Sequence, residues 1–286
     1  MNPSLLIRLV FVLVGIFSVY IFFINFIKIA AAYYNNRGII KKSKNDLDGA
    51  ITDYDKAIAL NPKSAKAHTN RGNAKHLMGN LADAIADHDK AIELNPGFAK
   101  SYNNRAQTKQ SAADLDGAIA DYNAAIELNS NYALAYRNRG VAKEAKSDLA
   151  GAIDDYKKAI ASSKDDAAYS HFRHILLTRR LYRDYSTPEL AQTVANWKDS
   201  WLKTVGLHLT GTLAESDFLA QAAQGDAKTV RERQCEAYYY VGMTHLLANE
   251  TAVAQKFFEK CVGTKMKIFD EFILARAELA RLSSKQ

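Results

Sequence analysis

Apolar residues along most of this chain recur at spacings of three and four, the spacing that lines one stripe of an α-helix. Between residues 31 and 166 this pattern itself returns every 34 residues, with two amphipathic stretches in each period. The period is clearest in a triplet of asparagine, arginine and glycine or alanine that begins at Asn36, Asn70, Asn104 and Asn138. A fixed period of this length indicates a repeat protein. We therefore predict four helical hairpins, at 31–64, 65–98, 99–132 and 133–166.

Other columns of the repeat keep the same register. Small residues recur at Ala50, Ala84, Ala118 and Ala152, and aromatic residues or histidine recur at Tyr54, His88, Tyr122 and Tyr156. The small residue of each triplet is expected to let the first helix of a hairpin approach the second closely. Asp46, Asn80, Asp114 and Asp148 are suited to cap the second helices, and Pro62 and Pro96 stop them.

These columns resemble those of the tetratricopeptide-repeat (TPR) family. The resemblance rests on the aromatic residue at Tyr34, Tyr102 and Tyr136, together with the small, aromatic, small and proline positions that follow it. It covers residues 31–166, where His68 and His88 replace aromatic residues and Ser130 replaces a proline. The resemblance implies an all-α fold in which stacked hairpins form a right-handed superhelix, an α-solenoid.

The rest of the soluble part is also predicted to be helical. In residues 235–286 a degenerate copy of the repeat places Tyr238, Gly242 and Phe258 at the aromatic, glycine and aromatic positions. A last helix is expected to cover the end of the solenoid. Residues 167–234 are predicted to be a non-repeat connector. The helices expected in this connector are Tyr169–Tyr182, a helix from Pro188 through Trp197 and Trp201, and Glu215–Ala223. The last helix of the chain, after the degenerate repeat, is expected at Phe269–Leu282.

Residues 1–30 contain an uncharged apolar stretch from Leu9 to Ile27. As a helix this stretch would span roughly 29 Å, close to the hydrocarbon thickness of a bilayer. We predict a transmembrane anchor, with membrane contact over residues 5–29. A cleavable signal peptide is the alternative, because Ala30-Ala31-Ala32 offers small residues, although the stretch exceeds the usual length of about 7–15 residues. The basic residues that follow would by themselves favour a cytoplasmic domain.

Charge and cysteine content narrow the classes of partner. The formal net charge is +7, but no segment is strongly basic, so no nucleic-acid partner is expected. The one local cluster of basic residues is expected to be a solvated helix face; it consists of Arg173, Arg179, Arg180 and Arg183.

The only cysteines are Cys235 and Cys261. Two buried thiols, or a disulfide across the last hairpin in an oxidising compartment, both stay open.

The chain shows no signature of catalysis. It contains no glycine-rich phosphate loop, no zinc-ligand spacing and no serine-nucleophile elbow. His171 and His174 can share one helix face, but no third ligand is evident. We therefore expect no cofactor, no metal and no enzymatic activity, with a metal- or thiol-dependent enzyme as the less favoured alternative.

Repeated polar residues of the first helices form the candidate binding site. In the TPR family these helices line the concave groove, so the resemblance implies a ladder of amides there, made by Asn36, Asn70, Asn104 and Asn138. An asparagine amide both donates and accepts hydrogen bonds, which suits the backbone of an extended peptide. The candidate basic residues of the groove are Lys66, Lys100 and Arg137. The alternative is that the asparagines only cap or bridge adjacent hairpins.

The arginine of each triplet is in phase with an aspartate on the second helix. The arginines are Arg37, Arg71, Arg105 and Arg139, and the aspartates are Asp53, Asp87, Asp121 and Asp155. We expect ion pairs between the two helices of each hairpin. Treated as partly exposed pairs, each contributes about 0–1 kcal/mol.

The C-terminal half is similar to the tail of bacterial periplasmic TPR lipoproteins, which act as adaptors for cell-wall hydrolases and proteases. The similarity rests on Trp197 and Trp201, on residues 234–242 and on residues 272–282. It implies a membrane-anchored adaptor or scaffold that binds a partner protein or peptide. We expect a single-pass protein of the bacterial inner membrane with its soluble domain in the periplasm, where the N-terminal helix replaces the missing lipidation cysteine. A self-assembling membrane scaffold, a homo-oligomer, is the alternative.

Overall fold

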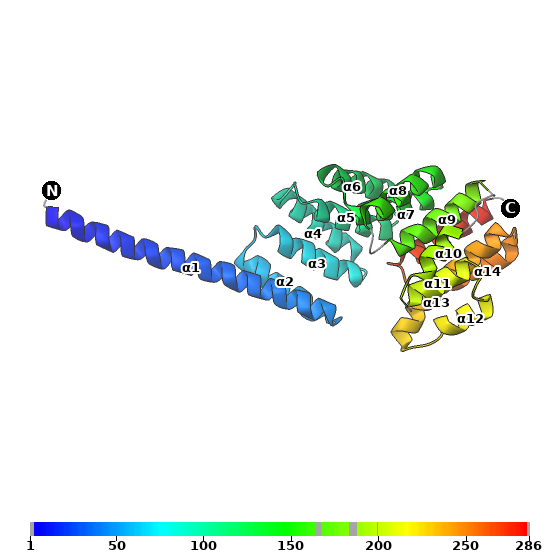
Figure 1. Ribbon diagram of the computed structural model, residues 1–286. Helices are drawn as coiled ribbons and strands as arrows, with labels where there is room; N and C mark the ends of the chain where they lie inside the picture. Colours follow the sequence, from blue (N-terminus) through cyan, green and yellow to red (C-terminus); the bar gives the residue numbers. More distant parts are fainter. Residues whose placement is uncertain (1–2, 164–166, 183–187, 199, 285–286) are drawn as a thin grey trace. The chain divides into compact units, whose positions relative to one another are not determined.

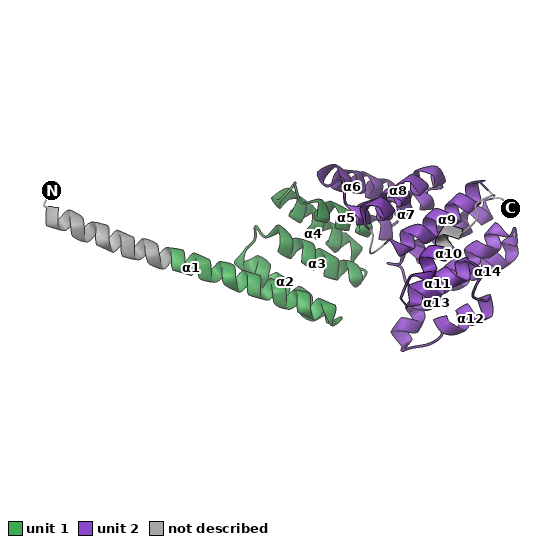
Figure 2. Ribbon diagram, viewed as in Figure 1, with its two compact units in different colours: residues 1–108 green, residues 109–286 purple. Residues whose placement is uncertain are grey.

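The structure, a computed structural model, describes residues 3–163, 167–182, 188–198 and 200–284, without the side chains of residues 3–20 and 188–190. In these ranges the chain is all-α. It divides into two compact units, residues 1–108 and 109–286 (Figure 2).

Unit 1 is a row of helical hairpins (Figure 1). Its helices are α1 (Pro3–Ser43), α2 (Leu47–Leu60), α3 (Ala65–Leu77), α4 (Leu81–Leu94) and the larger part of α5 (Ala99–Ser111). The turns inside its hairpins use left-handed backbone, with φ of 63° at Asn45 and 83° at Gly79. Such a residue ends one helix sharply and lets the chain reverse.

Unit 2 begins with two further hairpins and continues into non-repeat helices. The hairpins contain α6 (Leu115–Leu128), α7 (Ala133–Ala145) and α8 (Leu149–Ser162). The later helices are α9 (Ala168–Tyr182), α10 (Pro188–Ala195), α11 (Trp201–Leu209), α12 (Glu215–Ala222), α13 (Ala227–Leu247), α14 (Thr251–Gly263) and α15 (Asp270–Ser283).

Helix capping follows the sequence at three of the four expected positions. The side chains of Asp46, Asp114 and Asp148 accept hydrogen bonds from backbone N–H groups at the starts of α2, α6 and α8. Asn80 makes no such bond at the start of α4.

The close approach of paired helices at glycine is confirmed. A Cβ atom added to Gly140 would lie 2.8 Å from Cε1 of Tyr156, and one added to Gly242 would lie 2.6 Å from Cε1 of Phe258. Atoms this close overlap, so a larger residue at either position would force the facing ring to shift. The second contact joins α13 to α14 in the same way that the first joins α7 to α8.

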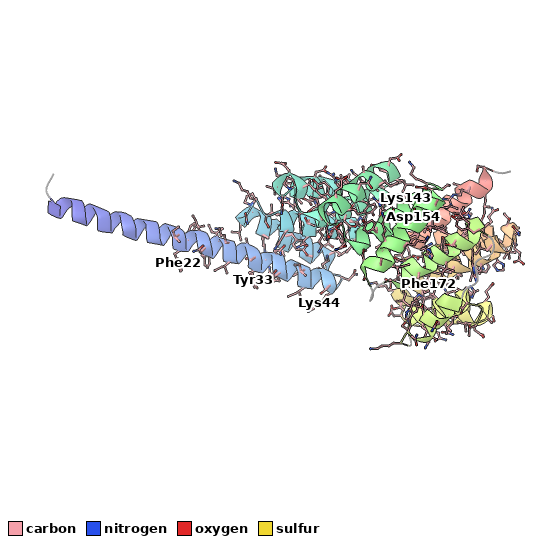
Figure 3. The ribbon with its side chains drawn as sticks, turned by 45° about the horizontal axis from the view of Figure 1, so that its top comes forward. Phe22, Tyr33, Lys44, Lys143, Asp154 and Phe172 are labelled. Atoms are coloured by element: carbon pink, nitrogen blue, oxygen red, sulfur yellow. The ribbon has the colours of Figure 1, made fainter. Side chains whose placement is uncertain are left out.

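Helix α1 runs without interruption from Pro3 into the first repeat and ends at Ser43. Within residues 21–29 the side chains of Phe22, Phe23, Phe26 and Ile29 are 60–74% exposed. Figure 3 shows Phe22 on a stretch of α1 that no other helix of unit 1 covers. The repeat helix and the N-terminal segment are thus one element.

Among the helices as far as they are described, none has the length and apolar character that crossing a membrane requires. Most of the predicted span Leu9–Ile27 falls on residues 3–20, whose side chains lie outside the described part.

The non-repeat helices differ from the prediction in two places. The helix expected to run from Pro188 through Trp201 is two helices, because α10 ends at Ala195 and Ser200 caps α11 by accepting from Lys203 N at 3.3 Å. Helix α13 begins at Ala227 instead of close to residue 235, because Asp226 accepts from the N–H groups of Lys228 and Thr229. Local capping explains both differences.

The two units have different cores. Unit 2 contains a large apolar core around Phe172, Phe218, Tyr239 and Phe258, all fully buried. In unit 1 the buried apolar residues are mostly alanines, with a small apolar cluster at Ala50, Tyr54 and Ala74. Buried polar side chains therefore carry more of the packing in unit 1.

Candidate functional site

Each repeat buries an aspartate of its second helix against cations of its first helix. In the first repeat, Arg37 Nε and Nη2 donate to the two carboxylate oxygens of Asp53 at 2.7 and 2.5 Å. Arg139 binds Asp155 in the same bidentate way, at 2.8 and 2.6 Å. The predicted ion pairs are confirmed for these repeats and for Arg71 with Asp87.

A second cation, which the sequence analysis missed, joins each aspartate. The ammonium groups of Lys41, Lys75, Lys109 and Lys143 lie 3.1, 2.8, 2.8 and 2.9 Å from Asp53, Asp87, Asp121 and Asp155. Each lysine follows the triplet arginine by four residues and so shares its helix face. The fixed period of this lysine column was the available signal.

The same arginines also reach back to the preceding hairpin. Arg71 Nη1 donates to Asp55 at 2.7 Å, and Arg105 Nη1 donates to Asp89 at 2.6 Å. In unit 2, Arg139 Nη1 donates to Asn123 at 2.6 Å. Each of these arginines therefore links the second helix of one hairpin to the first helix of the next.

The pairing shows in the carboxyl pKa values. The hydrogen bond from Arg37 lowers the pKa of Asp53 to about 2, against the opposing effect of burial. For Asp87, burial acts to raise the pKa, but the hydrogen bonds from Arg71 and Lys75 outweigh it, so the pKa is lowered. The aspartates are 0–5% exposed, so the expectation of partly exposed pairs was wrong for the acidic partner. Breaking a buried pair costs more than breaking a surface pair.

Polar side chains join successive first helices of unit 1. Asn70 Nδ2 donates to Asn35 Oδ1 at 2.9 Å, and the hydroxyls of Thr69 and Ser101 lie 3.0 Å apart. His76 Nδ1 lies 3.0 Å from the Thr108 hydroxyl. Helices α1, α3 and α5 consequently lie side by side. We call the surface of α1 from Ala31, α3, and α5 up to Thr108 the first-helix face.

Charge is segregated between the two sets of helices in unit 1. The stretches of α1, α3 and α5 that make the first-helix face contain no aspartate or glutamate. Helices α2 and α4 contain seven acidic residues and only two lysines. After the arginines and lysines that bind aspartates are set aside, the cations left on this face are Lys42, Lys66 and Lys100.

Lys42 and Lys100 are close enough to affect each other's charge. Burial lowers the pKa of Lys42, and the positive charge of Lys100 lowers it further. The two lysines come from the two outer helices of the face, α1 and α5. In the described part of the chain, neither is in an ion pair with a carboxylate. Positive charges that act on each other without an anion favour the binding of a negatively charged group.

The four predicted asparagines lie in different environments. Asn36 is exposed, Asn70 is half-buried, and Asn104 and Asn138 are only 7% and 2% exposed. The hydrogen bond from Asn70 to Asn35 bridges two adjacent hairpins, as the alternative interpretation of the asparagines expects. Asn104 Nδ2 makes no hydrogen bond among the described residues. The accessible amides are thus those of Asn36 and Asn70.

The predicted basic residues divide between the units. Lys66 and Lys100 are exposed and belong to unit 1, on the first turns of α3 and α5. Arg137 belongs to unit 2, where its guanidinium donates to Asn138 Oδ1 at 3.4 Å. The charge of Lys100 lowers the pKa of Lys42, a residue that the sequence analysis did not select.

Unit 2 contains a buried charged cluster around Arg173. This arginine is 2% exposed, donates to Glu271 at 2.7 Å and stacks 4.2 Å above the ring of Tyr239. Glu144, fully buried, accepts from the hydroxyls of Tyr156 and Tyr239 at 2.8 and 3.0 Å. Arg173 Nη1 makes no hydrogen bond among the described residues and lies 3.8 Å from Glu144 Oε1. The partners of the cluster come from inside the unit, which makes this a structural network.

The arginines of α9 were therefore assigned wrongly to a solvated face. Arg180 is half-buried and donates to Glu278 at 2.6 Å, and Arg183 lies outside the described residues. Charged residues on a helix that is covered on most sides must find partners, and α13 and α15 supply them.

The residues with metal or thiol chemistry do not assemble into a site. Among described residues, no group of three or more histidine, cysteine, aspartate or glutamate side chains is arranged to hold a metal ion. Cys235 and Cys261 are free, buried thiols with sulfur atoms 3.6 Å apart.

Models of a repeat family match the periodic part of the chain. The model described as TPR repeat matches residues 38–79 and 114–147, and the model described as Tetratricopeptide repeat matches residues 65–98. The chain contains tetratricopeptide repeats. The matched residues cover the end of α1, helices α2 to α4, and helices α6 and α7.

Solved structures share the fold of this chain. A tetratricopeptide repeat protein from Parabacteroides merdae aligns with a TM-score of 0.56 and 18% identity, over 87% of this chain and 99% of that chain. The pilF protein of Pseudomonas aeruginosa aligns with a TM-score of 0.53 and 12% identity, over 91% and 99%. At these identities the likeness concerns the fold alone. A search of curated proteins finds no match.

Proposed function

We propose that this TPR protein is an adaptor that binds an acidic, extended segment of a partner protein on the first-helix face of unit 1. The observation that carries the proposal is the charge of this face: Lys42, Lys66 and Lys100 lie on it, and none of its helices contributes a carboxylate to it. A like-charged pair is destabilising unless an anion joins it. TPR proteins mediate protein or peptide binding, which makes a peptide carboxylate the natural anion.

Further groups on the face suit the same ligand. Lys66 occupies on α3 the position that Lys100 occupies on α5, and both are exposed. The amides of Asn36 and Asn70 supply donors and acceptors for a peptide backbone. The lysines favour a negatively charged ligand, and the amides favour a peptide with an extended backbone.

Binding of a labelled acidic peptide tests the proposal. The probe is a fluorescein-labelled decapeptide of alternating glutamate and glycine, compared with its glutamine counterpart, and the full chain is kept in neutral detergent. Replacing Lys42 and Lys100 by glutamine is expected to weaken binding of the acidic peptide about tenfold, from roughly 0.5–1 kcal/mol per exposed charge contact. Higher salt should weaken it as well.

A matched variant removes the same charge elsewhere in unit 1. Lys44→Gln with Lys63→Gln takes two exposed lysines from outside the face, and it is expected to bind the peptide as the unmodified protein does. Equal affinity of both double variants, or equal binding of the glutamate and glutamine peptides, would remove the acidic-ligand proposal. Asn36→Ala with Asn70→Ala tests the backbone contacts separately.

The membrane anchor remains part of the proposed function. Its support is the uncharged stretch Leu9–Ile27 and the exposed phenylalanines of α1 at residues 22, 23 and 26. Large apolar side chains exposed on one helix indicate a contact with lipid or protein. Because α1 continues into the first repeat, unit 1 would stand close to the bilayer. A resident of the bacterial inner membrane with both units in the periplasm is the arrangement we propose.

Fractionation and a topology reporter test this anchor. The protein should stay in the membrane pellet after alkaline carbonate extraction, whereas a variant lacking residues 1–20 should be released. A reporter fused after Gln286 should be active in the periplasm. Release of the intact chain by carbonate would contradict the anchor, and a cytoplasmic reporter signal would reverse the orientation.

Self-assembly is a second candidate, favoured by the charge segregation. The acidic helices α2 and α4 of one copy complement the first-helix face of another. Light scattering should then report oligomers at low ionic strength that dissociate in salt. A monomer under both conditions would exclude this alternative.

A further inference from the structure

A pocket with two cations that form no ion pair among the described residues lies within unit 2, apart from the first-helix face. It has a volume of about 240 Å³. The C-terminal part of α5 and the end of α7 form one side, and the segment around α15 forms the other. The apolar walls come from Leu115, Phe272 and Ile273, and the polar groups come from Ser111, Lys267 and Arg276.

The wall that α15 provides is held rigidly. Arg281 Nη2 donates to the carbonyl oxygen of Ala145 at 3.1 Å, and Nε donates to the Ser147 hydroxyl at 2.7 Å, so it caps the end of α7. At the other end of α15, Glu271 accepts from the buried Arg173 at 2.7 Å. A pocket between fixed elements needs little ordering when a ligand binds.

The cations at this pocket lack anionic partners. Lys267 and Arg276 are both exposed, and over the described residues neither forms an ion pair. Asp270, on the first turn of α15, does not line the pocket. The pocket therefore combines uncompensated positive charge, a hydroxyl donor at Ser111 and an apolar floor.

We infer that this pocket binds the C-terminal residue of a peptide that ends in an apolar side chain. The terminal carboxylate faces Arg276 and Lys267, and the side chain lies against Phe272 and Ile273. The volume is below the range of about 300–1,000 Å³ that is usual for drug-sized ligands, so a single residue fits better than a larger molecule. An arginine offers a carboxylate two parallel hydrogen bonds, which makes Arg276 the principal contact.

This site is independent of the proposed ligand face on unit 1. It belongs to another unit, it recognises a chain end instead of internal acidic side chains, and α15, which lies outside the four repeats, supplies one of its walls. The two sites can therefore fail separately in experiment.

The probe is a fluorescein-labelled octapeptide of alternating glycine and serine in which leucine replaces the last residue, measured by anisotropy with the full chain. Binding is expected for the free carboxylate and to weaken about tenfold or more for the C-terminal amide, from the loss of a charge-assisted hydrogen bond. Glycine in place of the terminal leucine should also weaken binding. Equal affinity of acid and amide would overturn the inference.

Variants locate the site. Arg276→Gln and Lys267→Gln are each expected to weaken binding about fivefold to tenfold, while Arg231→Gln, an exposed arginine of α13, should leave it unchanged. The Lys42→Gln with Lys100→Gln variant should also bind normally. Full binding by Arg276→Gln, or loss of binding in the Lys42 and Lys100 variant alone, would overturn the pocket assignment. All five positions are outside the cores, so folding should be retained.

Discussion

Arg71 holds the buried Asp87, which lies sixteen residues after it, with Nη2 2.5 Å from Oδ1 and Nε 2.9 Å from Oδ2. The same guanidinium binds Asp55, sixteen residues before it, at 2.7 Å. One side chain thus joins the two helices of its own repeat and the last helix of the preceding repeat. A solenoid has only nearest-neighbour interfaces, so a residue at both of them strongly affects its stability.

Removing this guanidinium should destabilise unit 1. Arg71→Met keeps the apolar stem but leaves Asp87 with Lys75 alone, so we expect a loss of about 3 kcal/mol, the lower end for breaking a buried pair. Urea unfolding followed by circular dichroism measures the change. As a control, Lys90→Met breaks an exposed pair with Glu93 and should cost less than about 0.5 kcal/mol. Similar losses in both variants would contradict the special role of Arg71.

His88 should make stability sensitive to acid. Burial, reinforced by the charge of His76, lowers the pKa of His88 from 6.5 to about 4. The folded state therefore favours the neutral ring. The contribution to stability is present above pH 6.5 and is lost as the pH falls toward 4, because the unfolded state binds the proton first.

Tyrosine at this position should remove that dependence, since Tyr122 and Tyr156 fill the equivalent positions. Between pH 7 and pH 5, His88→Tyr should lose about 1–2 kcal/mol less of its free energy of unfolding than the unmodified protein. Urea titrations at both pH values give the comparison. Parallel losses in the two proteins would show that His88 does not titrate as its burial requires.

Glu236 should make the free energy of unfolding fall as the pH rises. Burial, followed by the negative charge of Glu271, raises the pKa of Glu236 to about 8, although Trp201 Nε1 and the Tyr169 hydroxyl donate to it at 2.8 and 3.1 Å. The folded state keeps the proton that the unfolded state releases above about pH 4.5. This contribution to stability is full below pH 4.5 and is lost as the pH rises through 8.

Glu236→Gln should flatten the decline of stability between pH 5 and pH 8 and make the protein more stable at pH 8, by about 1–3 kcal/mol. Glutamine retains an oxygen that accepts from Trp201, so tryptophan fluorescence follows the same contact in both proteins. Glu232→Gln, on the more exposed side of α13, is the control and should leave the profile unchanged. A steeper decline in the Glu236 variant would contradict the sign.

Cys235 and Cys261 should form a disulfide within one chain when treated with diamide. Their sulfur atoms are 3.6 Å apart across the α13–α14 hairpin. Each thiol loses a hydrogen, and diamide is reduced to the hydrazine, so the protein mass falls by about 2 Da. Closing this loop should stabilise the protein by about 3 kcal/mol. Cys235→Ser should abolish both changes, and formation of linked dimers only would contradict the contact.

Local chemistry explains why much of unit 1 was predictable. The glycine at Gly38 faces Tyr54, and Arg37 meets Asp53, because both contacts lie inside one hairpin whose two helices keep the same register in every repeat. The burial of Asn104 and the pairing of Lys42 with Lys100 were not predictable in the same way. They depend on how neighbouring hairpins stack. The pattern of apolar residues along the chain does not indicate how deeply a polar residue is buried.

The C-terminal half shows more clearly which contacts could not be predicted from the sequence. Its fifth hairpin was visible because Gly242 and Phe258 keep the repeat offsets, whereas Arg173 was assigned to solvent. Its partner Glu271 is 98 residues away and comes from a helix outside the repeat.

The sequence by itself determined the period, the helical hairpins and the contacts within them, because these follow from residue spacing on a helix. Only the tertiary structure decided which polar residues are buried, which lysines remain without an acid, and where α15 returns to form a pocket. Those properties arise from contacts between elements distant along the chain, and their geometry is settled by packing.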